Sequence, residues 1–345
     1  MALRLIEIFI PPKDEYRVQQ ALKDRKFLDM WQERFSKDLV NIKILLPTEE
    51  TEEVLDLLEK HISRVEGYRI FLIQVEASLP RPAPSKEEIH EGEEAQPEQK
   101  TKQKKSRISR EELYADIDAT IKLSKIFVIL ALLSSVVAAV GILQDNVAVI
   151  IGAMVIAPLL GPNLALSLAT TLGDIDLARS ALKANAAGIL AVLSFAAVIG
   201  YLLKFDPDIP QIISRTRVSL GDIIMALAAG SAAALSITTG VSSALIGVMV
   251  AVALLPPLVV FGMMLGSGNW VLATGAGMLV LVNLICINLA GVMTFWIQGI
   301  QPRKLWEADR AIKATKMAIM LWTLLLIALV LILFSPLTPH FLTHR

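Results

Sequence analysis

The feature that most constrains this chain is a series of long apolar segments that begins near residue 124. A helix needs about 20 consecutive apolar residues to cross the hydrocarbon core of a membrane. A single water-soluble core does not explain such a series, so we expect an α-helical polytopic membrane domain over residues 124–345. Its seven predicted spans are Ser124–Leu143, Val147–Leu172, Leu177–Leu203, Leu220–Thr239, Ser242–Ser267, Trp270–Gln298 and Met317–Phe334.

A basic cluster stands just before the first apolar segment, although the whole chain has a formal net charge of zero. Cytoplasmic loops are enriched in Lys and Arg, so the cluster predicts a cytoplasmic N-terminal domain in a multi-pass protein of the cell membrane. Seven crossings then put the C-terminus outside, and so does the alternative topology in which the two broken segments are re-entrant, because the number of crossings stays odd. A second interpretation is a binding site for anionic membrane lipid. The basic residues are Lys100, Lys102, Lys104, Lys105, Arg107 and Arg110.

Residues 1–79 have the pattern of a small soluble domain. Alternating and β-branched runs predict four strands, and two segments have helical periodicity. The order βαββαβ is typical of a ferredoxin-like α+β sandwich. The second strand has an alternative, because the first helix could continue through Trp31. The predicted strands are Leu3–Ile10, Phe27–Arg34, Leu39–Leu46 and Tyr68–Val75, and the helices are Lys13–Lys23 and a segment that begins at Thr48.

Two connecting segments follow this domain. Residues 80–105 are rich in Pro, Glu, Gln and Lys, so they cannot repay the entropy of ordering and are predicted to form a flexible linker. Residues 106–123 are predicted to form an amphipathic helix. Ser109 and Glu112 have the spacing of a capping box, and the apolar stripe is Leu113, Ile117 and Ile121.

The membrane domain contains an internal repeat. Shifting the sequence by 95 positions aligns Ile151 and Gly152 with Ile246 and Gly247, and Gly173 with Gly268. The repeats cover about 124–203 and 219–298, and each holds three apolar segments. A three-span unit followed by a second copy gives the inverted topology found in many secondary transporters. The seventh span, 317–334, lies outside the repeat.

The middle segment of each repeat carries helix-breaking residues. Pro158, Gly161, Pro162 and Asn163 interrupt the first, and Pro256 with Pro257 interrupt the second. Proline frees helical carbonyls, which lipid cannot satisfy. Paired broken helices therefore predict a transport site, with the two breaks facing each other around a cavity near mid-membrane. The alternative is a pair of packing kinks.

Polar residues near the breaks complete a candidate substrate-binding site. Since no fixed charge is predicted at mid-depth, we expect a small neutral solute, or an ion held by carbonyls and helix ends. No catalytic group or metal ligand set is predicted, and the cofactor is unknown. The candidate residues are Pro158, Gly161, Pro162, Asn163, Ser167, Thr238, Thr239, Ser242, Ser243, Pro256, Pro257 and Asn283.

Three stretches resemble a known family. They are Val75–Arg81 (VEASLPR), Ser109–Tyr114 (SREELY) and above all Val149–Pro162 (VIIGAMVIAPLLGP). With these stretches the chain is similar to the hydrophobic membrane proteins of domain of unknown function 389. The resemblance covers nearly the whole chain and implies a regulatory-looking module on the cytoplasmic face. It brings no settled substrate and no catalytic residues.

Two functions follow from these patterns. The first is a transporter or channel for a small solute or ion. The alternative is a membrane-anchored sensor or scaffold that forms homo-oligomers, for which Gly262 and Gly266 offer a small-xxx-small contact. The expected partners are membrane lipid, further copies of the chain and a small solute or ion, with no nucleic acid. The sequence has no HExxH motif and no phosphate-binding glycine loop, so we expect no enzyme.

Overall fold

The computed structural model describes residues 3–23, 25, 27–63, 65–75, 108–240, 243–300 and 305–333. For residues 243–252, 305–311 and 333 it describes the backbone alone. The chain divides into two compact units, Met1–Glu112 and Leu113–Arg345. The predicted linker, residues 80–105, lies outside the described residues.

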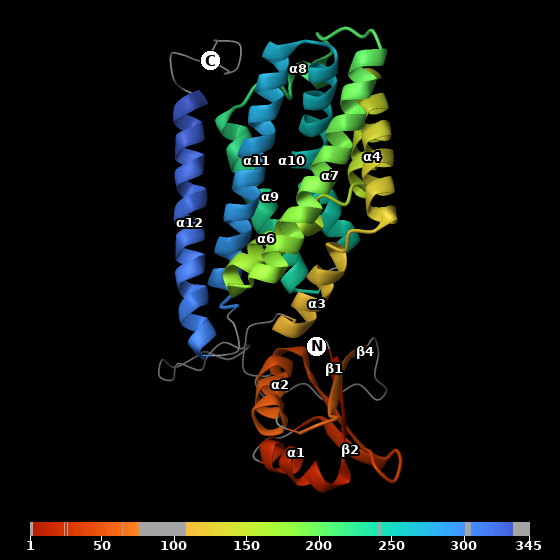
Figure 1. Cartoon of the computed structure of the whole chain (residues 1–345), viewed down its shortest axis with the longest axis vertical. Helices are drawn as coiled ribbons and strands as arrows, with labels where there is room; N and C mark the ends of the chain where they lie inside the picture. The colour runs from red at the N-terminus through yellow and green to blue at the C-terminus, as the bar shows by residue number, and fades with distance from the viewer. Residues whose placement is uncertain are drawn as a thin grey trace, which may run out of the picture. The chain divides into compact units, whose positions relative to one another are not determined.

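The described part of the first unit forms a four-stranded antiparallel sheet with α-helices against it (Figure 1). The strand order is β2-β3-β1-β4, so β1 lies between β3 and β4 and pairs antiparallel with both. The predicted small sheet and the order βαββαβ are confirmed, and the second strand forms instead of a longer helix. The elements are β1 (Leu3–Ile10), η1 (Pro12–Asp14), α1 (Glu15–Leu22), β2 (Asp29–Arg34), β3 (Val40–Pro47), α2 (Thr48–Ile62) and β4 (Arg69–Val75).

The core of this unit follows from the alternation along β1. Ile6, Ile8 and Ile10 are fully buried, and they belong to one cluster with Val54 and Leu58 of α2. Each such side chain contributes roughly 1.5–3 kcal/mol when it is removed from water. One face of the sheet is thereby covered by helices.

Helix α3 (Arg110–Thr120) begins in the first unit and continues into the second. Oγ of Ser109 accepts the backbone N–H of Glu112 at 3.2 Å, as the predicted capping box requires. The Glu112 carboxylate has a different partner, because Nη2 of the buried Arg4 donates to it at 2.7 Å. The predicted apolar stripe of α3, Leu113 and Ile117, is buried.

The second unit is a helical bundle. We call its two ends the α3 end and the α8 end, after the short helices that lie there (Figure 1). The helices are α4 (Lys125–Leu143), α5 (Val147–Ile156), α6 (Leu160–Leu172), α7 (Ile175–Leu202), α8 (Pro210–Ile213), α9 (Leu220–Thr238), α10 (Ser243–Gly266), α11 (Trp270–Ile297) and α12 (Leu305–Leu333).

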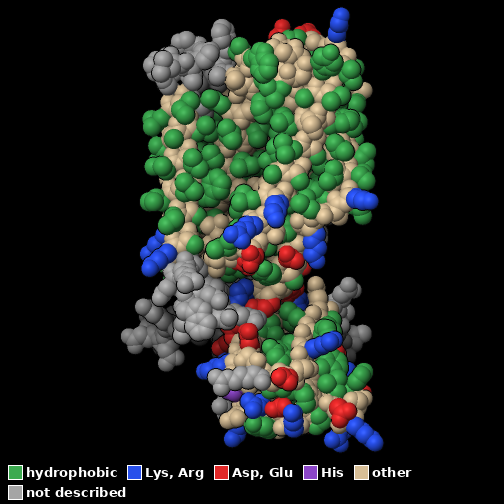
Figure 2. Space-filling view, viewed as in Figure 1, with side chains coloured by type: hydrophobic (Ala, Val, Ile, Leu, Met, Phe, Trp, Pro, Cys, Tyr) green, Lys and Arg blue, Asp and Glu red, His purple; other side chains and the backbone are tan. Residues whose placement is uncertain are grey.

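Five described helices are long and apolar enough to cross a membrane, and the bent pair α5–α6 brings the number to six. Of α10, the part with described side chains, Ala253–Gly266, is a shorter apolar helix. Hydrophobic side chains cover most of the face of the bundle in Figure 2, and exposed ones include Ile126 and Ile224. These helices indicate a membrane-associated protein.

The two predicted helix breaks have different outcomes. The first is confirmed: α5 ends at Ile156, α6 begins at Leu160, and the two are bent by 52°. The second is wrong, because α10 continues through Pro256 and Pro257. At the first break, Ala157 is extended before Pro158, because a residue before proline avoids the helical region. Leu255 precedes Pro256 in the same way and stays helical, so the second outcome depends on contacts outside the local sequence.

Helix boundaries in the two halves of the bundle agree at one offset. Helix α4 begins at Lys125 and α9 at Leu220, 95 residues later, and both have 19 residues. Helix α7 begins at Ile175 and α11 at Trp270, again 95 residues apart, and both have 28 residues. The caps agree as well. Oγ of Ser124 and Oγ of Ser219 each accept the backbone N–H of the third residue of the helix, Phe127 in α4 and Asp222 in α9.

Helices α7 and α10 pack backbone to backbone through small residues. A Cβ atom on Gly262 would lie 2.5 Å from Cβ of Ala196, and one on Gly266 would collide with the Ala197 carbonyl. The small-xxx-small pair is therefore used within the chain. The sequence-based suggestion that Gly262 and Gly266 serve contacts between copies is wrong for this surface.

We expect the substitution Gly266→Val to lower the melting temperature of the detergent-solubilised protein strongly. Overpacking of a tight contact costs about 1–3 kcal/mol, and here the backbone of α7 has to move. The control is Gly152→Val in α5, where no atom lies within 4 Å of the added Cβ. Equal melting temperatures for the two variants would contradict the close packing of α7 on α10.

Candidate functional site

Three buried asparagines from three helices meet inside the bundle. They are Asn163 of α6, Asn185 of α7 and Asn288 of α11, which are 1%, 6% and 0% exposed. Asn163 and Asn185 form a reciprocal amide pair, with Nδ2 to Oδ1 distances of 3.2 and 3.1 Å. Nδ2 of Asn288 donates to Oδ1 of Asn163 at 3.0 Å. The cluster therefore joins three helices by polar contacts in an apolar interior.

Asn163 is the centre of this cluster. Its Nδ2 also donates to the carbonyl of Leu159 at 2.8 Å, next to the α5–α6 break. Both side-chain hydrogens and both lone-pair positions of the Asn163 amide are then used. An amide with every group satisfied is inexpensive to bury, whereas one left unpaired costs about 1–3 kcal/mol. The asparagines thus fix the break of the first half in one arrangement.

Ser167 extends the contact between α6 and α11. Its Oγ donates to the Asn163 carbonyl at 3.0 Å, and a Cβ atom on Gly291 would lie 2.6 Å from it. Gly291 therefore lets α11 approach the hydroxyl. The positions 95 residues from Ser167 and Gly291 are Gly262 and Ala196, and they are also in contact. Gly262 of α10 packs on Ala196 of α7.

Asn283 of α11 replaces one of the helical hydrogen bonds that the prolines of α10 remove. Pro257 has no N–H, so the carbonyl of Ala253, four residues earlier, has lost its helical donor. Nδ2 of Asn283 donates to that carbonyl at 2.6 Å. A side chain from another helix thereby replaces the missing backbone bond.

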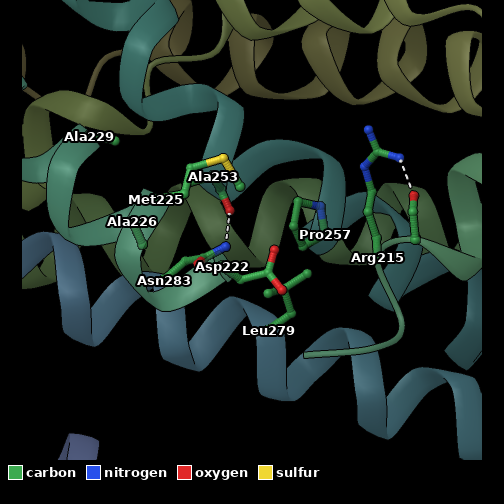
Figure 3. Close-up of a pocket in the computed structure, with 10 residues that line it drawn as sticks. Arg215, Asp222, Met225, Ala226, Ala229, Ala253, Pro257, Leu279 and Asn283 are labelled. Atoms are coloured by element: carbon green, nitrogen blue, oxygen red, sulfur yellow. Dashed lines mark hydrogen bonds between the residues drawn. The ribbon is translucent and has the colours of Figure 1, made fainter. Parts of the chain in front are cut away.

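A pocket of about 210 Å³ opens beside this repaired position (Figure 3). It lies between the α8–α9 region, the first turns of α9, and the middle of α10 and α11. Helices α9 and α11 each supply both kinds of lining residue: Asp222 and Asn283 are polar, and the other lining residues of these two helices are apolar. The lining residues are Ser214, Arg215, Asp222, Met225, Ala226, Ala229, Ala253, Pro257, Leu279 and Asn283.

The pocket carries charges of both signs. Oδ2 of Asp222 accepts the backbone N–H and the hydroxyl of Ser219, which caps α9. The Arg215 guanidinium donates to the Gln211 side chain at 2.7 Å. Burial lowers the pKa of the Arg215 guanidinium, and the charge of Asp145 partly opposes this shift. The predicted absence of fixed charge concerns mid-depth, whereas Asp222 lies in the first turn of α9 and Arg215 precedes that helix.

A second, much smaller void lies between the two halves of the bundle. Its volume is about 10 Å³, close to the space that one water needs. The eight lining residues form four pairs whose members stand 95 residues apart in the sequence: Leu159 with Leu254, Asn163 with Leu258, Asn185 with Val280, and Ile189 with Leu284. Equivalent positions of the two halves therefore face each other across this void.

The structure distributes the predicted site residues over separate places. Asn163 and Ser167 lie in the asparagine cluster, with Pro162 buried next to them on α6. Pro158 lies in the break itself, and Gly161 packs against Thr120 of α3. These residues belong to the first half.

The predicted residues of the second half divide differently. Pro257 and Asn283 line the pocket, and Pro256 precedes them within α10. Thr238 and Thr239 are absent from the pocket lining, because they follow Ala229 by about 14–15 Å in the direction of the α9 axis. Ser242 lies outside the described residues, and so does the side chain of Ser243.

Several residues of these sites were not among the predicted site residues, and four of them carry amide or charged groups. Asn185 and Asn288 interrupt apolar spans, and the cost of an amide in lipid is the signal that finds both. Arg215 and Asp222 stand at predicted span ends, where a solvated charge is the ordinary interpretation. No pattern in the sequence indicates that they share a pocket with Asn283.

Comparisons with known proteins support the family resemblance. A family model described as "Domain of unknown function (DUF389)" matches residues 154–289. An uncharacterised protein of Methanocaldococcus jannaschii is 37% identical over 335 residues, which make up 95% of this chain and 98% of the relative. No solved structure matches the chain.

A double-mutant cycle tests the asparagine cluster. We expect Asn163→Ala and Asn185→Ala to destabilise the solubilised protein, and the double variant to lose less than the two single losses together. The coupling energy should be about 0.5–2 kcal/mol, because the two amides bond each other. The measurement is thermal unfolding, with the exposed Ser194→Ala of α7 as control. Additive losses would contradict the reciprocal pair.

Proposed function

Because the chain belongs to the DUF389 family, its function has to come from the structure, and we propose that it is a membrane transporter or channel for a small solute or ion. The observation that carries this proposal is the void lined by four pairs of equivalent residues. Substrate paths of transporters built from inverted repeats run between the repeats, near the middle of the bilayer.

The proposal includes an inverted repeat of three segments. Three facts support it: the shared 95-residue offset of helix boundaries, the matching serine caps, and left-handed glycines at Gly173 and Gly268 after α6 and α10. The two turns that hold these glycines lie at opposite ends of the bundle, the first at the α3 end and the second at the α8 end (Figure 1). An odd number of crossings per repeat accounts for this reversal.

The topology that we propose has seven crossings in the cell membrane, with the broken α5–α6 pair crossing once. The N-terminal unit is then a cytoplasmic regulatory domain, as the basic residues before the first span favour. We propose that this domain acts on the bundle through α3. Arg4 donates to Glu112 in the first turn of α3, and the later turns of α3 belong to the second unit. Self-association into homo-oligomers stays a prediction.

The solute that fits is small and polar. The pocket volume of about 210 Å³ suits a molecule of a few non-hydrogen atoms, and Arg215, Asp222 and Asn283 offer donors and acceptors to it. The sensor or scaffold alternative needs a surface for further copies. Its candidate surface at Gly262 and Gly266 is occupied by α7, so transport has the stronger support.

Flux through proteoliposomes tests the proposal. We expect the reconstituted protein to raise the uptake of at least one solute in a panel of glycerol, glycine, urea and potassium chloride, measured by swelling and light scattering. Ala229→Trp fills the pocket and should lower that flux at least tenfold. Ile224→Trp, on the 68% exposed outer face of the same helix, is the matched control.

Two results would contradict transport. One is uptake equal to that of protein-free liposomes for every solute of the panel. The other is equal flux through the Ala229→Trp variant and the Ile224→Trp control, because a path through the pocket cannot survive its filling.

A further inference from the structure

Resting on the transport function proposed above, we propose a second solute pocket, equivalent to the one beside Asn283, that opens at the α3 end when the first pocket closes. It lies between α4, α6 and α7 and is closed in this structure. It receives the same small polar solute, so the two pockets are the alternating entrances of one path.

The position of the second pocket follows from the 95-residue offset. Each lining position of the open pocket has an equivalent in the first half. Arg215, Asp222 and Ala229 correspond to Thr120, Phe127 and Ser134, and Pro257, Leu279 and Asn283 correspond to Pro162, Ala184 and Gly188.

Packing closes this equivalent pocket. Oγ1 of Thr120 lies 2.5 Å from the place of a Cβ on Gly161, so the end of α3 sits directly on the start of α6. Cδ2 of Leu159 and Cζ of Phe127 lie 2.9 and 3.4 Å from the place of a Cβ on Gly188. Where the second half has a pocket between helices, the first half has side chains in contact.

The exposure of equivalent residues also differs between the two halves. Ser134 is fully buried on α4, whereas its equivalent on α9, Ala229, lines the open pocket and is partly exposed. Phe127 is 5% exposed, whereas its equivalent, Asp222, lies at the pocket. Two halves of the same architecture thus adopt one open and one closed arrangement.

A hydrogen bond holds the closed side. Oη of Tyr114 on α3 donates to Oδ2 of Asp174 in the α6–α7 turn at 3.0 Å. Burial and the bond to Asp174 raise the pKa of Tyr114 to about 12, so the phenol keeps its proton at neutral pH. The equivalent positions in the second half are Ile209 and Asn269, and an isoleucine side chain cannot make this bond.

Alternating access then results when the two halves exchange their open and closed arrangements. When α3 leaves Gly161, the first half adopts the open arrangement that the second half has here, and α9–α11 adopt the closed one. Helices α4 and α9 have equal lengths, and so do α7 and α11. A solute and one hydrogen bond can then shift the populations of the two arrangements. The α3-end pocket has no equivalent of the Asp222 charge, since Phe127 stands there, and it should hold the solute less tightly.

Thiol labelling of equivalent positions tests this inference. The only cysteine of the chain, Cys286, is replaced by alanine, and single cysteines are placed by Ser134→Cys or Ala229→Cys. A charged, membrane-impermeant methanethiosulfonate is applied to vesicles of each orientation. We expect A229C to react from the side of the α8 end and S134C from the side of the α3 end.

Tyr114→Phe supplies the diagnostic change, because it removes the bond that holds the closed side. We expect it to raise the labelling rate of S134C at least fivefold and to lower that of A229C. Asp174→Asn, which keeps an oxygen for capping α7, is the second variant if Tyr114→Phe does not fold. Opposite changes in the two rates support alternating pockets.

Two outcomes would overturn the inference. The first is that the cysteine introduced by S134C is labelled from neither side of the membrane in the Tyr114→Phe variant, which shows that no second pocket opens. Rates that rise together show one pore opening, as in a channel. In either case solute flux in liposomes still decides the transport function, so the two proposals fail separately.

Discussion

The carbonyl of Ala253 has no helical donor, because Pro257 lacks an N–H. The packing around α10 therefore depends on a donor from another helix. An unpaired carbonyl in an apolar interior costs several kcal/mol, because lipid offers no donor. Asn283 from α11 supplies one at 2.6 Å. This contact keeps α10 helical, ties it to α11 and places an amide at the wall of the pocket.

The first half meets the same condition in another way. At the position equivalent to Ala253 it has Pro158, which forces Ala157 out of the helical region and bends the chain by 52°. Asn163 then bonds the Leu159 carbonyl and joins two further asparagines. In the second half, the continuous helix α10 lies beside the open pocket. In the first half, α5 and α6 are bent, and Thr120 of α3 contacts Gly161 at the start of α6. Pro158 and Ala253 stand 95 residues apart, so this difference between the helices follows from the residue at one position.

Much of this arrangement follows from local patterns in the sequence. Strand alternation predicted the sheet of the first unit, and apolar length predicted the long helices of the second, since both depend on near neighbours in the chain. The Pro158 break was predictable for the same reason. The outcome at Pro257 was not, because it depends on a donor from a helix that begins 13 residues later, at Trp270. Arg215 and Asp222 were missed likewise, since sharing a pocket with Asn283 is a property of the folded bundle.

The central claim, that the two halves are inverted copies, is tested most directly by the sides on which equivalent residues lie. Ile175 and Trp270 begin α7 and α11, stand 95 residues apart and are 65% and 66% exposed. Each is replaced singly by cysteine in the Cys286→Ala protein, and sealed vesicles of known orientation are treated with an impermeant thiol reagent. The account predicts that the two cysteines react from opposite sides of the membrane. Reaction of both from the same side would contradict it.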